Sequence, residues 1–177
     1  RQAVIVAVTA AVLLVVFCVK AALLPLYFWL PATYASAAAP VAALFAIMTK
    51  VGAYSILRVF VPIFGPDAGP LAGLIWPWLL PLALATLAVG TLGALAARGL
   101  RRQVAYLVVA SVGSLLIAFG LGSGAGIGAG LYYLPHSTFA AAALFLLADI
   151  IAKGRGDHGD RLDPGPAIPG SVVAGAL

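Results

Sequence analysis

Long apolar runs alternate with short polar or proline-rich interruptions along the chain, and this pattern predicts membrane-spanning helices. Five runs have roughly the 20 apolar residues that a helix needs to cross the hydrocarbon core of a bilayer. They cover residues 2–24, 40–60, 71–97, 103–121 and 127–151. A shorter aromatic segment, residues 26–39, follows the first run and is too short to span alone. The pattern predicts an all-α, polytopic transmembrane helix bundle of about five spans.

Pro25 is expected to break the first span. Proline lacks an N–H group, its ring clashes with the carbonyl four residues earlier, and it moves the preceding residue out of the helical region. We therefore expect an interruption near residues 24–27, with residues 26–39 as the second half of a broken helix. Such breaks are tolerated at membrane depth where the freed carbonyls face protein or a water-filled cavity, as in transporters. An interfacial turn with its aromatic rings at headgroup level is the alternative.

Two lysines lie inside the apolar runs. A charged side chain at the centre of a membrane helix costs about 2.5–3.5 kcal/mol on insertion scales, so Lys20 and Lys50 are candidate functional residues. On a helix Lys50 shares a face with Ala46 and Tyr54, which favours packing against another helix over exposure to lipid. His136, in the fifth run, is a third candidate because a histidine can donate and accept a proton near neutral pH. A histidine bonded to a neighbouring carbonyl, without a transport role, is the alternative.

Composition agrees with a membrane protein, since 64% of the residues are hydrophobic and 8% are charged. The net charge of +5 does not indicate nucleic acid, because the basic residues stand at the ends of apolar runs or singly within them. We find no nucleophile-base-acid set, phosphate-binding loop or metal-ligand spacing, and so predict no enzyme, cofactor site or metal site. The alternating glycines of residues 120–130 lack the preceding strand of a dinucleotide-binding loop, and a flexible turn is predicted there.

The basic residues indicate an orientation in the membrane. Arg98, Arg101 and Arg102 follow the third run, and Lys153 follows the fifth, where Asp149 can pair with it one helical turn away. The positive-inside rule places both groups on the cytoplasmic side.

Residues 1–153 are predicted to form one transmembrane domain, and the Gly/Pro-rich residues 154–177 a linker or loop. Because the chain has no initiator methionine and Arg1 leads straight into an apolar run, we expect it to be a fragment.

A specific motif surrounds the two lysines. It comprises Lys20, Pro25-Leu26, Trp29-Leu30-Pro31, Pro40-Val41, Thr49-Lys50-Val51-Gly52, Tyr54 and Arg58. This motif resembles the antiporter-like membrane subunits, which are the proton-pumping subunits of respiratory complex I and the large subunits of multi-subunit (Mrp-type) sodium/proton antiporters. With Tyr27-Phe28 after the Pro-Leu pair, the chain looks most like the D-type large subunit of the Mrp antiporter.

The resemblance implies a proton-translocating subunit in which Lys20, Lys50 and His136 form a path across the bundle. It also implies other membrane subunits as partners, the bilayer as surroundings, protons and monovalent cations such as Na⁺ as cargo, and the bacterial inner (plasma) membrane as location. In this family the position of Lys20 pairs with a glutamate on an earlier helix, and this chain has no glutamate. The fourth span departs from complex I, because Ser111 stands five residues after Tyr106 where a histidine is frequent.

Two other functions stay open at this point. The same helices could belong to a proton-pumping membrane subunit of complex I or of a membrane-bound hydrogenase, in which electron transfer elsewhere drives the protons. A membrane scaffold without transport is the other alternative, although a scaffold has little reason to keep two lysines in mid-span.

Overall fold

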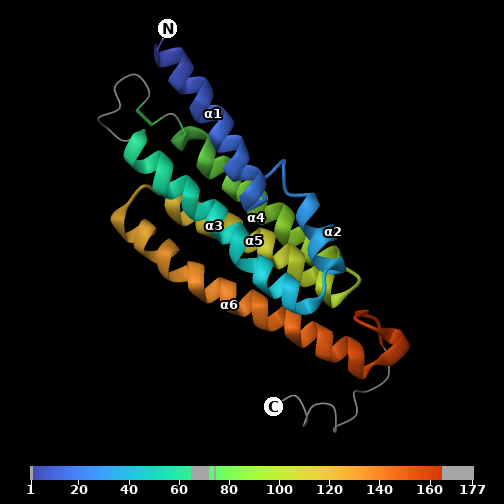
Figure 1. Ribbon diagram of the computed structural model, residues 1–177. Helices are drawn as coiled ribbons and strands as arrows, with labels where there is room; N and C mark the ends of the chain where they lie inside the picture. Colours follow the sequence, from blue (N-terminus) through green and yellow to red (C-terminus); the bar gives the residue numbers. More distant parts are fainter. Residues whose placement is uncertain (1, 65–71, 74, 165–177) are drawn as a thin grey trace.

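The computed structural model describes residues 2–64, 72–73 and 75–164, and its regular elements in this part of the chain are all helices (Figure 1). They are α1 (Gln2–Ala21), α2 (Trp29–Ser36), α3 (Ala39–Ile63), α4 (Trp76–Ala96), α5 (Leu100–Gly120), α6 (Gly124–Gly154) and the short 3₁₀ helix η2 (Gly156–His158). Helices α1, α3, α4, α5 and α6 are each long and apolar enough to cross a membrane. The predicted polytopic helix bundle is confirmed.

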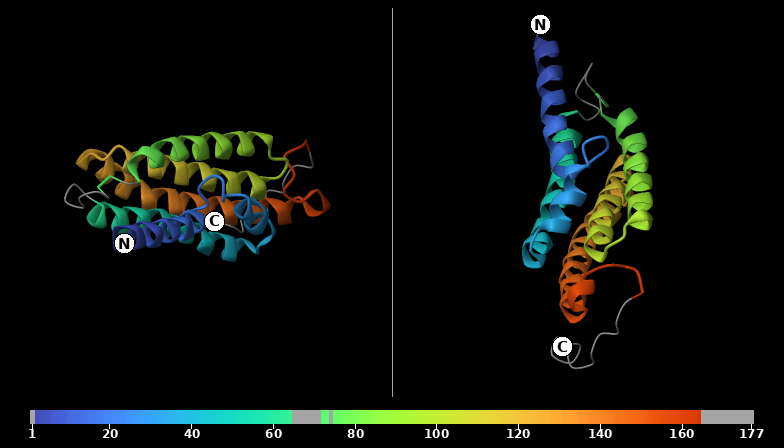
Figure 2. Two further views of the ribbon diagram at one scale, coloured as in Figure 1. Left: turned by 90° about the horizontal axis from the view of Figure 1, so that it is seen from above. Right: turned by 90° about the vertical axis from the view of Figure 1, so that its right-hand side faces the viewer.

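The long helices lie side by side and are roughly aligned (Figures 1 and 2). Helix α3 packs against α1 on one side and α6 on the other, while α5 packs against α4, α6 and the short α2. Helices α3 and α5 also touch, which brings the second half of the broken helix, the Lys50 helix and the His136 helix around α5.

Small residues let α4 and α5 approach closely. Thr86, Gly90 and Ala94 form a buried row on α4. A methyl group added to Gly90 would lie 2.5 Å from the amide nitrogen of Ala110. One added to Gly113 of α5 would lie 2.6 Å from the nitrogen of Leu87, so the backbones meet on both sides of the contact. In lipid, where helices do not gain much from the hydrophobic effect, this close van der Waals packing is a main source of association.

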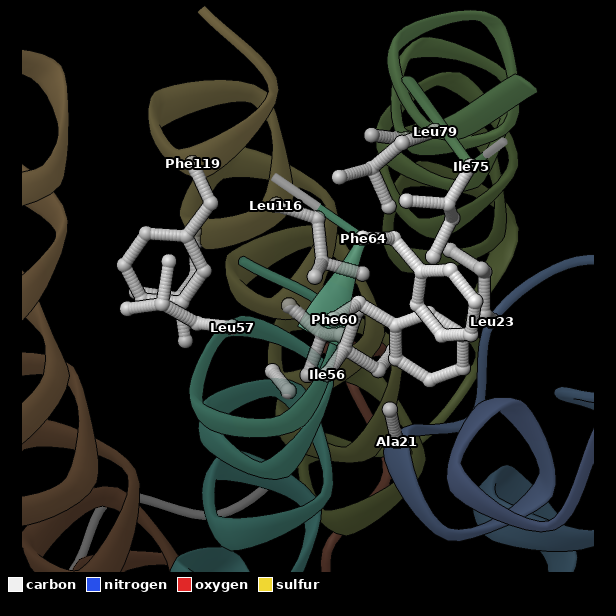
Figure 3. Close-up of a cluster of buried hydrophobic side chains, with 14 of the residues drawn as sticks. Ala21, Leu23, Ile56, Leu57, Phe60, Phe64, Ile75, Leu79, Leu116 and Phe119 are labelled. Atoms are coloured by element: carbon white, nitrogen blue, oxygen red, sulfur yellow. The ribbon is translucent and has the colours of Figure 1, made fainter. Parts of the chain in front are cut away.

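An apolar cluster fills the space between the end of α1 and helices α3, α4 and α5 (Figure 3). It includes Leu23, just after α1, together with Phe60, Leu79 and Leu116. The residues directly after α1 are therefore anchored in the core of the bundle and do not form a surface loop.

Two boundaries differ from the prediction. Helix α6 begins at Gly124 and so includes glycines that we expected in a flexible turn. The side chain of Ser123 explains this early start, because it accepts a hydrogen bond from the amide of Gly126 at 3.0 Å and caps the helix. Helix α4 begins at Trp76, and the predicted start of that span, residue 71, lies outside the described residues.

The chain after η2 returns to the connection between α4 and α5. Gly99 and Arg161 form an antiparallel bridge, and the amide of Leu100 donates to the carbonyl of Asp160 at 2.8 Å. The interpretation of residues 154–177 as a linker or loop stays a prediction, and residues 165–177 lie outside the described part of the chain.

Candidate functional site

The helix that carries Lys20 is interrupted on both sides of Pro25. Helix α1 ends at Ala21, Ala22 adopts a left-handed backbone (φ 55°), and regular helix resumes with α2 at Trp29. The expected break is therefore present, and it begins three residues before the proline.

Protein groups bind the backbone atoms that the break exposes. The amide of Leu24 donates to the hydroxyl of Thr86 on α4 at 3.0 Å. The carbonyl of Val19 accepts from the indole nitrogen of Trp29 at 3.0 Å. Because an unsatisfied backbone group costs several kcal/mol in hydrocarbon, these contacts allow a non-helical segment to persist inside the bundle.

Lys50 lies inside the bundle, as Ala46 on its face of α3 predicted, whereas Tyr54 on the same face is exposed. Its side chain has 0% exposure, as do those of Ala46 and Ala53 on the same face. The Lys50 ammonium donates a hydrogen bond to the hydroxyl of Ser111 on α5. Ser111 in turn donates to the carbonyl of Val108 at 2.7 Å. The resulting contact joins a buried charge to a neighbouring helix through one hydroxyl group.

Ser111 also lines a pocket of about 250 Å³ between α5 and α6. Other polar side chains around it are Ser114, Tyr133, His136 and Ser137. The rings of Tyr133 and His136 lie 6.3 Å apart, and His136 is itself exposed. The pocket therefore brings His136 to the same space that Lys50 reaches through Ser111.

Lys20 is not part of this arrangement. It occupies the last turn of α1 with its side chain exposed, and it is not among the residues that line the pocket. Its backbone nevertheless lies close to α3, because a methyl group added to Gly52 would be 2.7 Å from the nitrogen of Ala21. The structure thus assembles Lys50 and His136 around one pocket and leaves Lys20 on the surface of this part of the bundle.

Sequence reasoning missed the contact of Ser111 with Lys50. In the sequence this serine stands out only as a departure from a histidine, and a serine cannot hold a proton. The spacing from Tyr106 drew attention to Ser111, but its contact with Lys50 on α3 could be identified only from the packing of α3 against α5.

A charged cluster joins the ends of three helices. Asp149 of α6 pairs with Lys153 at 2.7 Å, as expected, and also with Arg101 of α5 at 2.8 Å. Arg101 reaches the carbonyl of Ala37, just after α2, at 3.4 Å. The two basic groups predicted to lie on one side of the membrane are therefore at the same end of the bundle.

Comparison with known proteins identifies the family. Residues 2–161 match the family described as NADH:quinone oxidoreductase/Mrp antiporter, TM. The D-type subunit of a probable K(+)/H(+) antiporter from Rhizobium meliloti is 41% identical over an alignment 190 positions long, which includes 98% of this chain and 35% of that protein. The D-type subunit of the Na(+)/H(+) antiporter from Alkalihalophilus pseudofirmus is 41% identical over 142 residues, which cover 80% of this chain and 28% of that protein.

A solved structure is similar as well. The Mrp complex of Dietzia sp. DQ12-45-1b superposes with a TM-score of 0.75 at 32% identity, over 84% of this chain and 28% of the matched chain. The chain thus spans about a third of the length of the curated relatives that it matches. Since the family match extends over nearly the whole bundle, from α1 to the residues after η2, the chain belongs to the NADH:quinone oxidoreductase/Mrp antiporter family of membrane proteins.

Proposed function

We propose that this chain is part of the proton-translocating subunit of a multi-subunit monovalent cation/proton antiporter in a bacterial inner membrane. The observation that carries the proposal is Lys50, a fully buried amine within a membrane span, bonded to a hydroxyl beside a polar pocket. A buried charge of this kind is costly and is kept where it has a function. The names of the two relatives, each a D-type subunit of a cation/proton antiporter, support the same interpretation.

In this proposal Lys50 and His136 are two stations of the proton path, and Lys20 is a third. A buried lysine can release and reload a proton as its surroundings change, because burial disfavours its charged form and a nearby carboxylate favours it. The exposed side chain of Lys20 is accessible to the acidic partner that the resemblance implies on an earlier helix. The other membrane subunits of the complex are the proposed partners.

The cation is a monovalent metal ion, and both Na⁺ and K⁺ are candidates. The two relatives that match at 41% identity carry different ions in their names, so similarity supports each equally. A proton-pumping subunit of an NADH:quinone oxidoreductase is the second candidate, because the family description includes that enzyme.

The proposal is tested by measuring cation/proton exchange in lysine variants of the full-length protein assembled in its complex. In everted membrane vesicles Lys50→Ala and Lys20→Ala are expected to slow the cation-driven collapse of a pH gradient by about 10²-fold, the lower range for a positioned proton-transfer group. Lys→Arg at either position should slow the exchange as well, because arginine does not release its proton. Assays with Na⁺ and with K⁺ identify the ion.

The matched control is Lys153→Ala, which removes the third lysine of the chain, an exposed residue at the end of α6. It should exchange at the wild-type rate. If the Lys20 and Lys50 variants, present at normal levels, did the same, the proton path would be wrong and the scaffold alternative would be favoured.

A further inference from the structure

The segment after η2 brings two arginines together at the end of α4. The amide of Leu162 donates to the carbonyl of Arg98 at 3.1 Å, next to the antiparallel bridge between Gly99 and Arg161. The guanidinium of Arg155 holds the same segment from the end of α6, because it donates to the carbonyl of Arg161. These contacts fix the backbones of Arg98 and Arg161 side by side, although the two residues are far apart in the sequence.

The side chains of both arginines are exposed and line one pocket of about 580 Å³. The pocket is lined by Ala97, Arg98, Arg161, Leu162 and Asp163. The ion pairs that the described residues form involve other basic groups, so neither arginine has an acidic partner among them. The carboxylate of Asp163 lies 3.6 Å from Nε2 of His158. Two cations and one carboxylate therefore face the pocket, and one positive charge is left uncompensated.

An apolar stripe on α4 leads toward this pocket. It consists of Leu84, Leu92 and Leu95, which the helical period places on one side of the helix and which are each at least half exposed. Helix α4 is long and apolar enough to cross a membrane and ends at Ala96, directly before the pocket. The pocket therefore lies at the level where the acyl chains of a bilayer meet its headgroups, with leucines on the acyl-chain side and arginines on the headgroup side.

We propose that this pocket binds the headgroup of an anionic phospholipid, with the phosphate between Arg98 and Arg161 and the acyl chains along the leucines of α4. A planar guanidinium donates paired N–H bonds to two phosphate oxygens, and basic pockets beside membrane spans bind such headgroups on the cytoplasmic side, which is the predicted side of this end. One uncompensated charge matches one phosphodiester, as in phosphatidylglycerol, whose glycerol hydroxyls can donate to Asp163. The site is separate from Lys50 and His136 and goes beyond the proposed function.

Titration with a labelled lipid tests the site in the full-length protein, assembled in its complex and held in mild detergent. The probe is phosphatidylglycerol with a fluorophore on one acyl chain. Arg98→Gln and Arg161→Gln should each weaken its binding about 5-fold, the contribution of one basic residue near an anionic lipid surface, and the double variant should weaken it at least about 10-fold. Arg102→Gln is the matched control. It removes an exposed arginine from the same end of the bundle that does not line the pocket, and it should leave the affinity unchanged.

Competition distinguishes an anionic lipid from other ligands. Unlabelled phosphatidylglycerol should displace the probe, whereas zwitterionic phosphatidylcholine and inorganic phosphate at the same concentration should not. Equal displacement by inorganic phosphate would identify a site for a soluble anion, and equal displacement by phosphatidylcholine a site that does not select for charge, and either result would overturn the proposal. An equal loss of affinity in Arg102→Gln would show a diffuse basic surface in place of a defined pocket. If the wild-type complex bound no probe, another chain would cover the pocket and the proposal would be wrong.

Discussion

At the scale of single residues, Arg101 connects three helices through its side chain and holds the segment after η2 through its backbone. Its guanidinium bonds Asp149 of α6 and the carbonyl after α2, and its backbone amide donates to the carboxylate of Asp160 at 3.0 Å. The side chains of Arg101 and Asp149 are 22% and 23% exposed, while that of Lys153 is 76% exposed. The two ion pairs of Asp149 should therefore contribute very differently to stability.

Replacement of each cation by glutamine separates these contributions. Arg101→Gln should lower the stability of the assembled protein by about 1.5–3 kcal/mol, the range for hydrogen bonds to a charged group. Lys153→Gln should cost only about 0–1 kcal/mol, because solvent screens an exposed pair. Thermal unfolding of the complex in mild detergent measures both. Equal losses of stability in the two glutamine variants would contradict this difference. If Arg101→Lys were as stable as the wild type, a positive charge at this position would be sufficient without the forked guanidinium.

At the scale of helices, the sequence predicted which face of a helix is buried better than it predicted which residues of other helices that face contacts. The inward direction of Lys50 followed from the small residues on its own helix, which the helical period brings onto one face. The contact with Ser111 and the hydrogen bond from Leu24 to Thr86 depend on how α3, α4 and α5 pack, and no local pattern determines that. Likewise, Pro25 predicted a break, but its start at Ala22 depends on the anchoring of Leu23 in the core.

The α4–α5 contact allows a prediction with an internal control. Alanine normally favours a helix by about 1 kcal/mol over glycine, and Gly128→Ala, with open space around it, should be neutral or stabilising by up to that amount. Gly90→Ala should instead destabilise the protein by about 1–3 kcal/mol, the usual cost of overpacking, because its new methyl group meets the backbone of Ala110. Thermal unfolding of both variants checks the opposite signs. A stabilised Gly90→Ala would show that the two helices can separate without cost.

At the scale of the whole molecule, charge is distributed unequally between the two ends of the bundle. One end carries the α4–α5 connection with Arg98 and Arg102, and the end of α6 with Lys153. The α5–α6 connection, residues 121–123, lies at the other end and has no charged residue. Lysine and arginine close to span ends determine orientation, with little contribution from acidic residues. We therefore predict that the Arg98 end is cytoplasmic and the Ser123 end is external.

Accessibility of single cysteines tests this orientation in the full-length protein, with Cys18→Ala. Arg102→Cys is exposed at the start of α5. It should react with a membrane-impermeant thiol reagent in everted vesicles, which expose the cytoplasmic face, and should not react in intact cells, in which the reagent reaches only the external face of the inner membrane. Leu121→Cys, exposed directly after the last residue of α5, should show the reverse pattern. Because the two positions terminate the same membrane span, they must label from opposite sides whatever the orientation. Labelling of Arg102→Cys from the external side would show that the topology is the reverse of the predicted one, and the assigned direction of proton movement past Lys50 would then be reversed as well.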